Sequence, residues 1–311
     1  MSEHTIYENQ MWPELSDCTL CPRECHVNRN AGETGYCGQT AVLTAARAAL
    51  HFWEEPCLSG TNGSGAVFFS GCNLRCVYCQ NHEIAHGLSG REITVSRLSE
   101  IFLELQEKGA HNVNLVTPTH FVPQIITALE TAKKQGLSIP VVYNSSAYEK
   151  TDTLKKLDGL VDIYLPDLKY FDSTLSSQYS HASDYFEVAA DAIAEMVRQT
   201  GAPVFTDGPD SLMKKGVIVR HLLLPGCEKD ARRILRYLHN TYKNDIYISI
   251  MNQFTPLTQV QDIPRLNRKI TSREYEKIID YAISIGIENG FIQEGETASE
   301  SFIPAFNGEG I

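Results

Sequence analysis

Short apolar runs alternate with helix-patterned segments along most of the chain, and this alternation most constrains the fold. The predicted strands lie at 66–69, 113–116, 141–143, 162–165, 217–224 and 246–250. The predicted helices lie at 96–108, 123–134, 152–157, 183–199, 229–242 and 272–285. Such alternation gives a parallel sheet with right-handed crossovers. Because six units are too few for a closed eight-unit barrel, the sequence predicts an α/β fold, a partial (β/α)6 TIM-type barrel.

Charge and hydropathy exclude several functions. Among 311 residues, Lys and Arg number 27 and Asp and Glu 38, so the formal charge is −11. A chain this acidic lacks the electrostatic footprint of nucleic-acid binding, and no nucleic-acid partner is expected. No apolar run approaches the length of a membrane span, and the first residues show no secretory signal. We therefore expect a cytoplasmic protein that does not enter the membrane.

Seven of the nine cysteines fall into two groups. In a reducing compartment, clustered cysteines indicate metal binding, catalysis or burial rather than disulfides. The first 60 residues are rich in Cys, Gly and Asn, and a loop-rich segment of this size usually needs a metal to stabilise it. The sequence thus predicts a metal-stapled segment at 1–60. It predicts a barrel with a C-terminal cover at 61–311.

The second cysteine group directly follows the first predicted strand. Cys72, Cys76 and Cys79 are spaced C-x3-C-x2-C, and ligands bind where parallel strands end. Three thiolates suit a [4Fe–4S] cluster with one iron left open. The alternatives are a structural zinc site, or a four-cysteine cluster completed by Cys57 or Cys227.

The pattern C-x3-C-x-aromatic-C, with Tyr78 before Cys79, resembles the radical S-adenosylmethionine (SAM) superfamily. The resemblance implies that SAM binds the open iron through its amino and carboxylate groups. It further implies reductive cleavage of SAM to a 5′-deoxyadenosyl radical that abstracts hydrogen from a substrate. An external reductant such as flavodoxin or ferredoxin is then the expected partner.

Further motifs are similar to pyruvate formate-lyase activating enzymes and to a branch of activating-enzyme-like proteins. They are the C-x2-C-P-x2-C segment, His51–Pro56 and Glu288–Gln293. This resemblance implies an oxidoreductase whose substrate is a glycyl radical enzyme polypeptide. An open barrel also leaves a lateral gap for a large substrate. The loop at 206–210 and the stretch 294–311, with Phe302, Ile303 and Phe306 packing inward, are candidate covers.

The same resemblance implies a set of SAM contacts. Asp167 and Lys169 match the Asp-Leu-Lys of activating enzymes, whose lysine contacts SAM. The family's Gly-Gly-Glu is replaced here by a sequence beginning at Thr117, where backbone carbonyls can still bind the amino group. Asn144 follows the third strand, and Asn252 or Gln253 follows the sixth.

Other polar residues have two interpretations. Arg220 pairs either with a carboxylate in the cavity or in an ordinary ion pair. His120 and His221 are expected to be structural or wall residues rather than cluster ligands.

The first cysteine group consists of Cys18, Cys21, Cys25 and Cys37. These four thiolates can complete a zinc site or a second iron–sulfur cluster, which could relay an electron to the first. The third alternative is that these four cysteines bind no metal. For the whole chain, the alternative to a radical SAM enzyme is a non-catalytic iron–sulfur or zinc protein in electron transfer or scaffolding.

Overall fold

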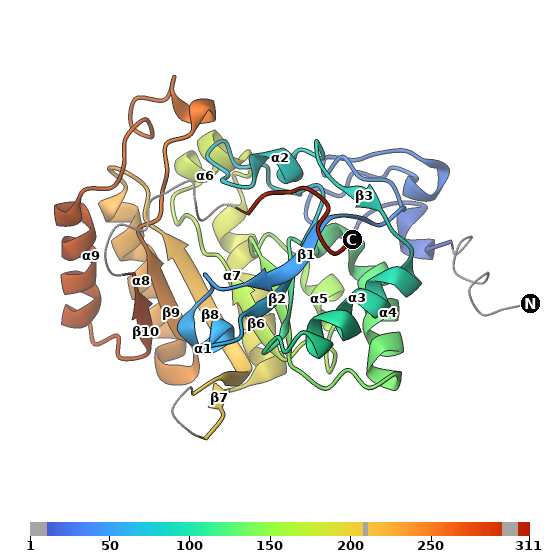
Figure 1. Cartoon of the computed structure of the whole chain (residues 1–311). Helices are drawn as coiled ribbons and strands as arrows, with labels where there is room; N and C mark the ends of the chain where they lie inside the picture. Colours follow the sequence, from blue (N-terminus) through green and yellow to red (C-terminus); the bar gives the residue numbers. More distant parts are fainter. Residues whose placement is uncertain (1–10, 208–210, 294–303) are drawn as a thin grey trace, which may run out of the picture.

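The structure, a computed structural model, describes residues 11–207, 211–293 and 304–311. Its strands follow the chain in this order: β1 (Thr44–His51), β2 (Ser64–Phe69), β3 (Arg91–Glu92), β4 (Val113–Val116), β5 (Val141–Ser145), β6 (Ile163–Pro166), β7 (Val204–Phe205), β8 (Met213–Leu222), β9 (Tyr247–Met251) and β10 (Gly290–Ile292). They form one sheet, ordered β10-β9-β8-β6-β5-β4-β2-β1-β3, with β7 paired to β8 (Figure 1).

The strands from β2 to β10 in this order pair in parallel, whereas β1 and β3 are antiparallel additions at one edge. Within the described ranges, no pairing joins β10 to β3, so the sheet is open. The expected α/β partial barrel is therefore confirmed. Every strand expected from the sequence is present, and all but one lie within two residues of their expected bounds.

The exception is β8, which begins at Met213 rather than at 217. Lys214 and Lys215 are exposed and gave no apolar signal, but their backbone continues the strand. There β7 pairs antiparallel with β8, Val204 opposite Lys215. This pairing places β7 at the start of β8, away from the strand ends that carry the cysteine loop (Figure 1). The expectation that 206–210 cover the cysteine loop is therefore wrong for Thr206 and Asp207. Residues 208–210 lie outside the described residues.

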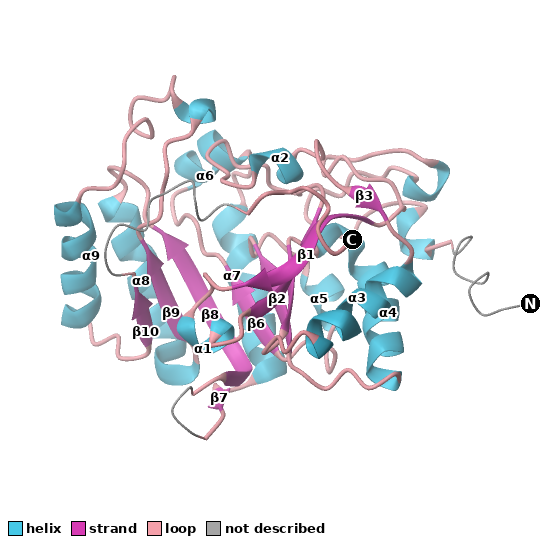
Figure 2. Cartoon of the chain, viewed as in Figure 1, coloured by secondary structure: helices cyan, strands magenta, loops and turns pink. Residues whose placement is uncertain are grey.

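The helices are α1 (Pro56–Ser59), α2 (His82–Ala85), α3 (Val95–Glu107), α4 (Val122–Lys134), α5 (Thr151–Lys155), α6 (Ser173–Ser180), α7 (Tyr185–Thr200), α8 (Glu228–Tyr242) and α9 (Ser272–Ser284). The longer helices flank the sheet, whereas α2 and α6 lie above the strand ends (Figure 2). On α3, Leu98, Ile101 and Leu105 are buried at helical spacing, as their sequence pattern predicts. No helix in these described parts is long and apolar enough to cross a membrane.

The C-terminal stretch 304–311 packs against β1, near the start of the chain. Strand β1 pairs antiparallel with β2, and His51 at its end lies opposite Ser64, the first residue of β2. Gly308 donates its N–H to the Ala46 carbonyl at 3.0 Å, so the C-terminal stretch lies along β1. Phe306 contacts Phe68 edge-on with ring centroids 5.5 Å apart. Phe306 thus packs inward as expected, while Phe302 and Ile303 lie outside the described residues.

Candidate functional site

A cavity of about 400 Å³ lies inside the open barrel. Cys72, Cys76 and Cys79 line it, and so do Glu54 and Glu55. The cysteines lie on the loop after β2, at the carboxyl ends of the parallel strands. Ligands of parallel α/β sheets bind at these ends, so the expected position of the cysteines agrees with their place in the fold.

The cysteine loop turns away from β2 at Gly71, whose φ is +85°. A Cβ here would lie 2.5 Å from the Gln39 side chain and 2.6 Å from the Cys37 carbonyl oxygen. Only glycine fits this close approach. The packing shows that the first cysteine group lies against the base of the second.

The Cys76 thiol ends a chain of hydroxyl groups. The Ser180 hydroxyl donates to the Cys76 Sγ at 2.9 Å. The Tyr170 hydroxyl lies 2.6 Å from that of Ser180 and 2.7 Å from that of Tyr78. Burial raises the pKa of Cys76, and the Lys169 ammonium opposes this shift. Sequence reasoning missed Ser180 and Tyr170 because no local pattern links them to residue 76.

Zinc and an iron–sulfur cluster need different arrangements of the cysteine thiols. In the part of the chain that the structure describes, no three His, Cys, Asp or Glu side chains gather closely enough to hold one metal ion. A zinc site needs such convergence, whereas a [4Fe–4S] cluster binds each thiolate to a different iron. The three thiols along one cavity wall therefore fit a cluster better than a single zinc ion.

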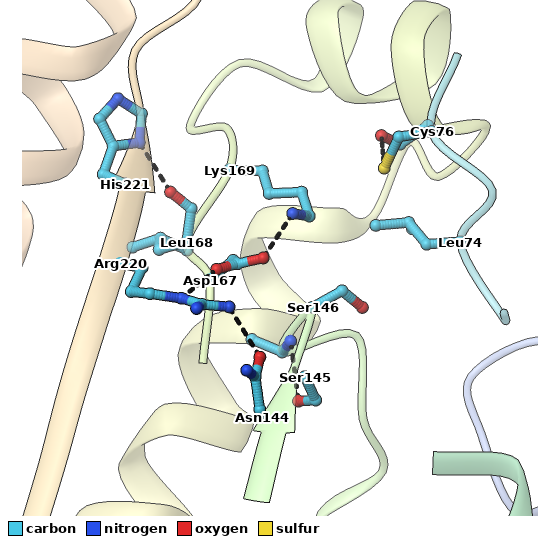
Figure 3. Close-up of polar contacts among 12 residues, drawn as sticks. Leu74, Cys76, Asn144, Ser145, Ser146, Asp167, Leu168, Lys169, Arg220 and His221 are labelled. Carbon is cyan, nitrogen blue, oxygen red and sulfur yellow. Dashed lines mark hydrogen bonds and ion pairs between the residues drawn. The ribbon is translucent and has the colours of Figure 1, made fainter. Parts of the chain in front are cut away.

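Lys169 and Asp167 form a buried charge network with Arg220 (Figure 3). The Lys169 Nζ lies 2.6 Å from the Asp167 Oδ2, and the Arg220 Nε lies 2.9 Å from Oδ1. Arg220 also donates to the Asn144 Oδ1 at 2.7 Å and pairs with Glu54 at 3.1 Å. Burial raises the pKa of Asp167, but the two cations outweigh it and hold that pKa below its usual range. Of the two readings of Arg220, the structure confirms pairing with cavity carboxylates.

Thr117 and Asn144, both expected near SAM, also line the cavity. Thr117 has a φ of +58°, which is costly for a β-branched residue. Its N–H donates to the Asn144 carbonyl at 2.9 Å, which helps to hold this backbone. Strained backbone of this kind concentrates at functional sites.

After β9, Gln253 lies among the lining residues and Asn252 does not. The Asn252 N–H instead donates to the Gln293 Oε1 at 2.8 Å. Of the two residues expected after the sixth strand, Gln253 is therefore the one placed to meet a ligand.

The two buried histidines have backbone partners. His120 Nε2 lies 2.6 Å from the Ser70 carbonyl oxygen, and His221 Nδ1 lies 2.8 Å from that of Leu168. Burial lowers the pKa of His120 to about 3 and that of His221 to about 4. Neither lines the cavity, which agrees with a structural role.

The four N-terminal cysteines lie near enough for their charges to interact, although no three of them converge closely enough to hold one metal ion. Burial raises the pKa of Cys37, the Arg29 cation opposes this, and the charges of Cys18 and Cys25 add to it. Arg29 is buried and donates to the His120 carbonyl at 2.7 Å, which fastens this segment to the barrel. The Tyr36 N–H donates to the Cys25 Sγ at 3.2 Å.

The geometry agrees with comparisons to known proteins. The family model of the radical SAM superfamily matches residues 66–226, more than half of the chain. The chain therefore belongs to the radical SAM superfamily. Members carry a [4Fe–4S] cluster and use SAM for radical chemistry, so the chain is an enzyme of this class.

Two curated proteins are similar to the chain. An uncharacterized protein of Methanocaldococcus jannaschii is 26% identical over 278 residues, which cover 86% of this chain and 75% of that protein. The pyruvate formate-lyase-activating enzyme of Clostridium pasteurianum is 26% identical over 167 residues, 50% of this chain and 69% of that enzyme.

Among solved structures, the FeFe-hydrogenase maturase HydG of Carboxydothermus hydrogenoformans shares the fold with a TM-score of 0.51 at 12% identity. The match covers 77% of this chain and 55% of the maturase, so the chain spans about half of that protein's length. This likeness supports the fold alone.

Proposed function

We propose that Cys72, Cys76 and Cys79 hold the [4Fe–4S] cluster and that the cavity beside them binds SAM. The observation that carries the proposal is that the three thiols line the same cavity as Lys169 and Asp167. When bound, the reduced cluster supplies the electron that cleaves SAM, and hydrogen abstraction from the substrate follows.

The chain's own residues bind and orient SAM in this proposal. The Lys169 ammonium attracts the SAM carboxylate, and Asp167 fixes that ammonium while Arg220 fixes Asp167. Asn144 and the backbone at Thr117 offer polar contacts on the neighbouring strand ends. The apolar side chains of the cavity wall exclude water from the reacting groups.

We further propose an oxidoreductase resembling activating enzymes, with a glycyl radical enzyme polypeptide as substrate and a flavodoxin or ferredoxin as reductant. The similarity to the pyruvate formate-lyase-activating enzyme supports this substrate class. The open sheet supports it too, because a polypeptide segment can enter where the barrel does not close.

The N-terminal cysteines form the second proposed metal site. Cys18, Cys21, Cys25 and Cys37 supply four thiolates, the number that zinc or an iron–sulfur cluster takes. No three of them converge on one point as they stand in the structure, so zinc binding requires these thiols to close around the ion. In this proposal the metal staples the N-terminal segment assigned to 1–60 onto the barrel of 61–311, and β1 of that segment extends the barrel's sheet. Elemental analysis distinguishes the two metals.

The proposed activity is tested with anaerobically reconstituted protein, a chemical reductant and SAM. We expect methionine and 5′-deoxyadenosine in equal amounts, and neither product when the reductant is omitted. Intact SAM in the presence of a reduced cluster would favour the non-catalytic alternative, an electron-transfer or scaffold protein.

The substrate class is tested with fractionated lysate from cells grown in deuterated medium. Deuterium in 5′-deoxyadenosine from the high-molecular-weight fraction is the expected result. Deuterium transfer from the low-molecular-weight fraction alone contradicts a polypeptide substrate while leaving the radical mechanism intact.

A further inference from the structure

Two consecutive carboxylates lie at the end of the cavity opposite the cysteine loop. Strand β1 runs antiparallel to β2, so the residues after His51 reach the end of the barrel where β2 begins. Glu54 and Glu55 follow there, directly before α1, and both line the cavity. The cavity thus extends from the thiols at one end to these carboxylates at the other.

Glu54 has its hydrogen bonds within the protein. Its Oε2 accepts from Arg220 at 3.1 Å, and its Oε1 accepts from the Asn114 Nδ2 at 3.0 Å. Arg220 in turn is shared with Asp167 and Asn144. Glu54 therefore completes the charge network around Arg220.

Glu55 differs from Glu54 because one of its oxygens has no partner. Ser249 lies close enough to lower the pKa of Glu55, but Oε2 is buried without a hydrogen-bond partner among the described residues. Only 7% of Glu55 is exposed to solvent. Buried carboxylate oxygens are normally hydrogen-bonded, so an unpartnered one beside a cavity indicates a missing ligand.

The charges that face the cavity leave one carboxylate without a cation. Glu54, Glu55 and Asp167 are acidic, and Lys169 and Arg220 are the basic lining residues among those that the structure describes. His51 also lines the cavity, but burial lowers its pKa to about 4, so it is neutral near pH 7. Burial raises the pKa of Glu55 and Arg220 only partly opposes this, so a further cation beside Glu55 would stabilise its ionised form.

We propose, building on the proposed function, that Glu55 forms a recognition subsite for a cationic nitrogen group of the substrate, an amine or a guanidinium. An N–H of this group would donate to the free Oε2 of Glu55, and the Ser249 hydroxyl would hold the carboxylate in place. The rest of the substrate then extends along the cavity toward the thiols. A free amine and a lysine side chain of a polypeptide offer the same chemistry.

The test uses the full-length reconstituted protein and measures binding by calorimetry. The probes are n-butylammonium, the neutral n-butanol, and a capped Gly-Lys-Gly peptide. We expect n-butylammonium to bind about tenfold or more tightly than n-butanol, as a charge-assisted hydrogen bond implies. Whichever of n-butylammonium and the peptide binds more tightly identifies the source of the cation.

Glu55→Gln keeps the shape of the side chain and removes its charge, and we expect n-butylammonium binding to fall about tenfold or more. The matched control is Glu130→Gln on the exposed face of α4, which should not change binding. Ser249→Ala keeps the charge but frees the carboxylate, so a smaller loss is expected. This second variant keeps the test decisive if Glu55→Gln does not fold.

Equal binding of n-butylammonium and n-butanol contradicts the subsite, as does unchanged binding in Glu55→Gln. Displacement of n-butylammonium by SAM also overturns it, because Glu55 would then serve the cofactor's own ammonium group. Wild-type protein that binds n-butylammonium but does not cleave SAM contradicts the proposed function alone. SAM cleavage without n-butylammonium binding contradicts this subsite alone.

Discussion

The Nε–H of Arg23 donates a 2.8 Å hydrogen bond to the carbonyl oxygen of Asn73. Arg23 lies among the N-terminal cysteines, and Asn73 lies within the loop of the proposed cluster ligands. The same guanidinium donates to the carbonyls of His181, at 2.6 Å, and Ser180, at 3.2 Å. One side chain thus joins the first cysteine group to both segments that surround Cys76.

Arg23→Ala should lower the free energy of unfolding by about 1–3 kcal/mol, because three backbone carbonyls lose a charged donor. Urea unfolding of protein with a fixed metal content measures the change. Arg273→Ala on the exposed side of α9 is the control, and its effect should stay within about 0.5 kcal/mol. Equal stability of the two variants contradicts the joining role of Arg23.

The parallel strands could be predicted from the sequence because buried strands are continuous apolar runs bounded by turns. Strand β1 could not be predicted in this way, because its sequence TAARAALH is rich in alanine and has low strand propensity. Pairing with β2 and the C-terminal stretch forms this strand. Its formation depends on these tertiary partners rather than on strand propensity.

The site residues also divide into those that local sequence patterns predict and those that only tertiary contacts bring together. The cysteine spacing and the Asp167–Lys169 pair are local patterns, and the structure brings them to one cavity. The bond from Ser180 to Cys76 joins residues 104 positions apart, so it has no sequence pattern. Glu55 could have been suspected, because two acidic residues before Pro56 lie in an otherwise apolar segment. The sequence does not show that its Oε2 lacks a partner.

Replacing Cys72, Cys76 or Cys79 with alanine should remove the visible absorbance of the proposed cluster and all SAM cleavage. The reason is that these thiolates are the proposed protein ligands of the cluster. Cys227→Ala, a buried cysteine at the start of α8, serves as the matched control and should retain both properties. Retained turnover in any one of the three variants contradicts the assignment.

A Cys18→Ala, Cys21→Ala double variant should lose one metal site while keeping the proposed cluster at Cys76. Stability should fall as well, because the free energy of structural metal binding contributes directly to folding. Elemental analysis for iron and zinc, with urea unfolding beside it, measures both effects. If iron and zinc contents do not change, the N-terminal cysteines bind neither metal.

His120 should make the protein less stable as the pH falls below about 6.5. Burial, assisted by Arg29, lowers the pKa of His120 to about 3, so the folded state stays neutral where the unfolded state takes up a proton. The stabilisation is complete above the unfolded pKa and is lost as the pH falls toward 3, at about 1.4 kcal/mol per pH unit.

Urea unfolding between about pH 7 and pH 5 tests this dependence. His120→Gln keeps a donor toward the Ser70 carbonyl but does not titrate, so its stability should fall less steeply than that of the wild type. Asn240→Gln, on the exposed side of α8, changes no titratable group and should retain the wild-type slope. Parallel curves for wild type and His120→Gln would exclude this contribution.

Lys169→Ala should weaken SAM binding while leaving the proposed cluster intact. The substitution removes the ammonium that Asp167 holds at 2.6 Å beside the cavity. A charge-assisted hydrogen bond to the SAM carboxylate is worth about 1.5–3 kcal/mol, or about 10- to 150-fold in affinity. Calorimetric titration with SAM measures the loss, and an unchanged iron–sulfur spectrum shows that the cluster persists.

Lys169→Met separates charge from packing in this experiment, because it keeps the apolar stem and removes only the ammonium. We expect it to bind SAM as weakly as Lys169→Ala. Lys134→Ala on the exposed side of α4 should bind SAM like the wild type. An unaltered dissociation constant for SAM in Lys169→Met would show that Lys169 only neutralises Asp167, and the contact to the SAM carboxylate would then have to come from another lining residue, with Arg220 the nearest cation on that network.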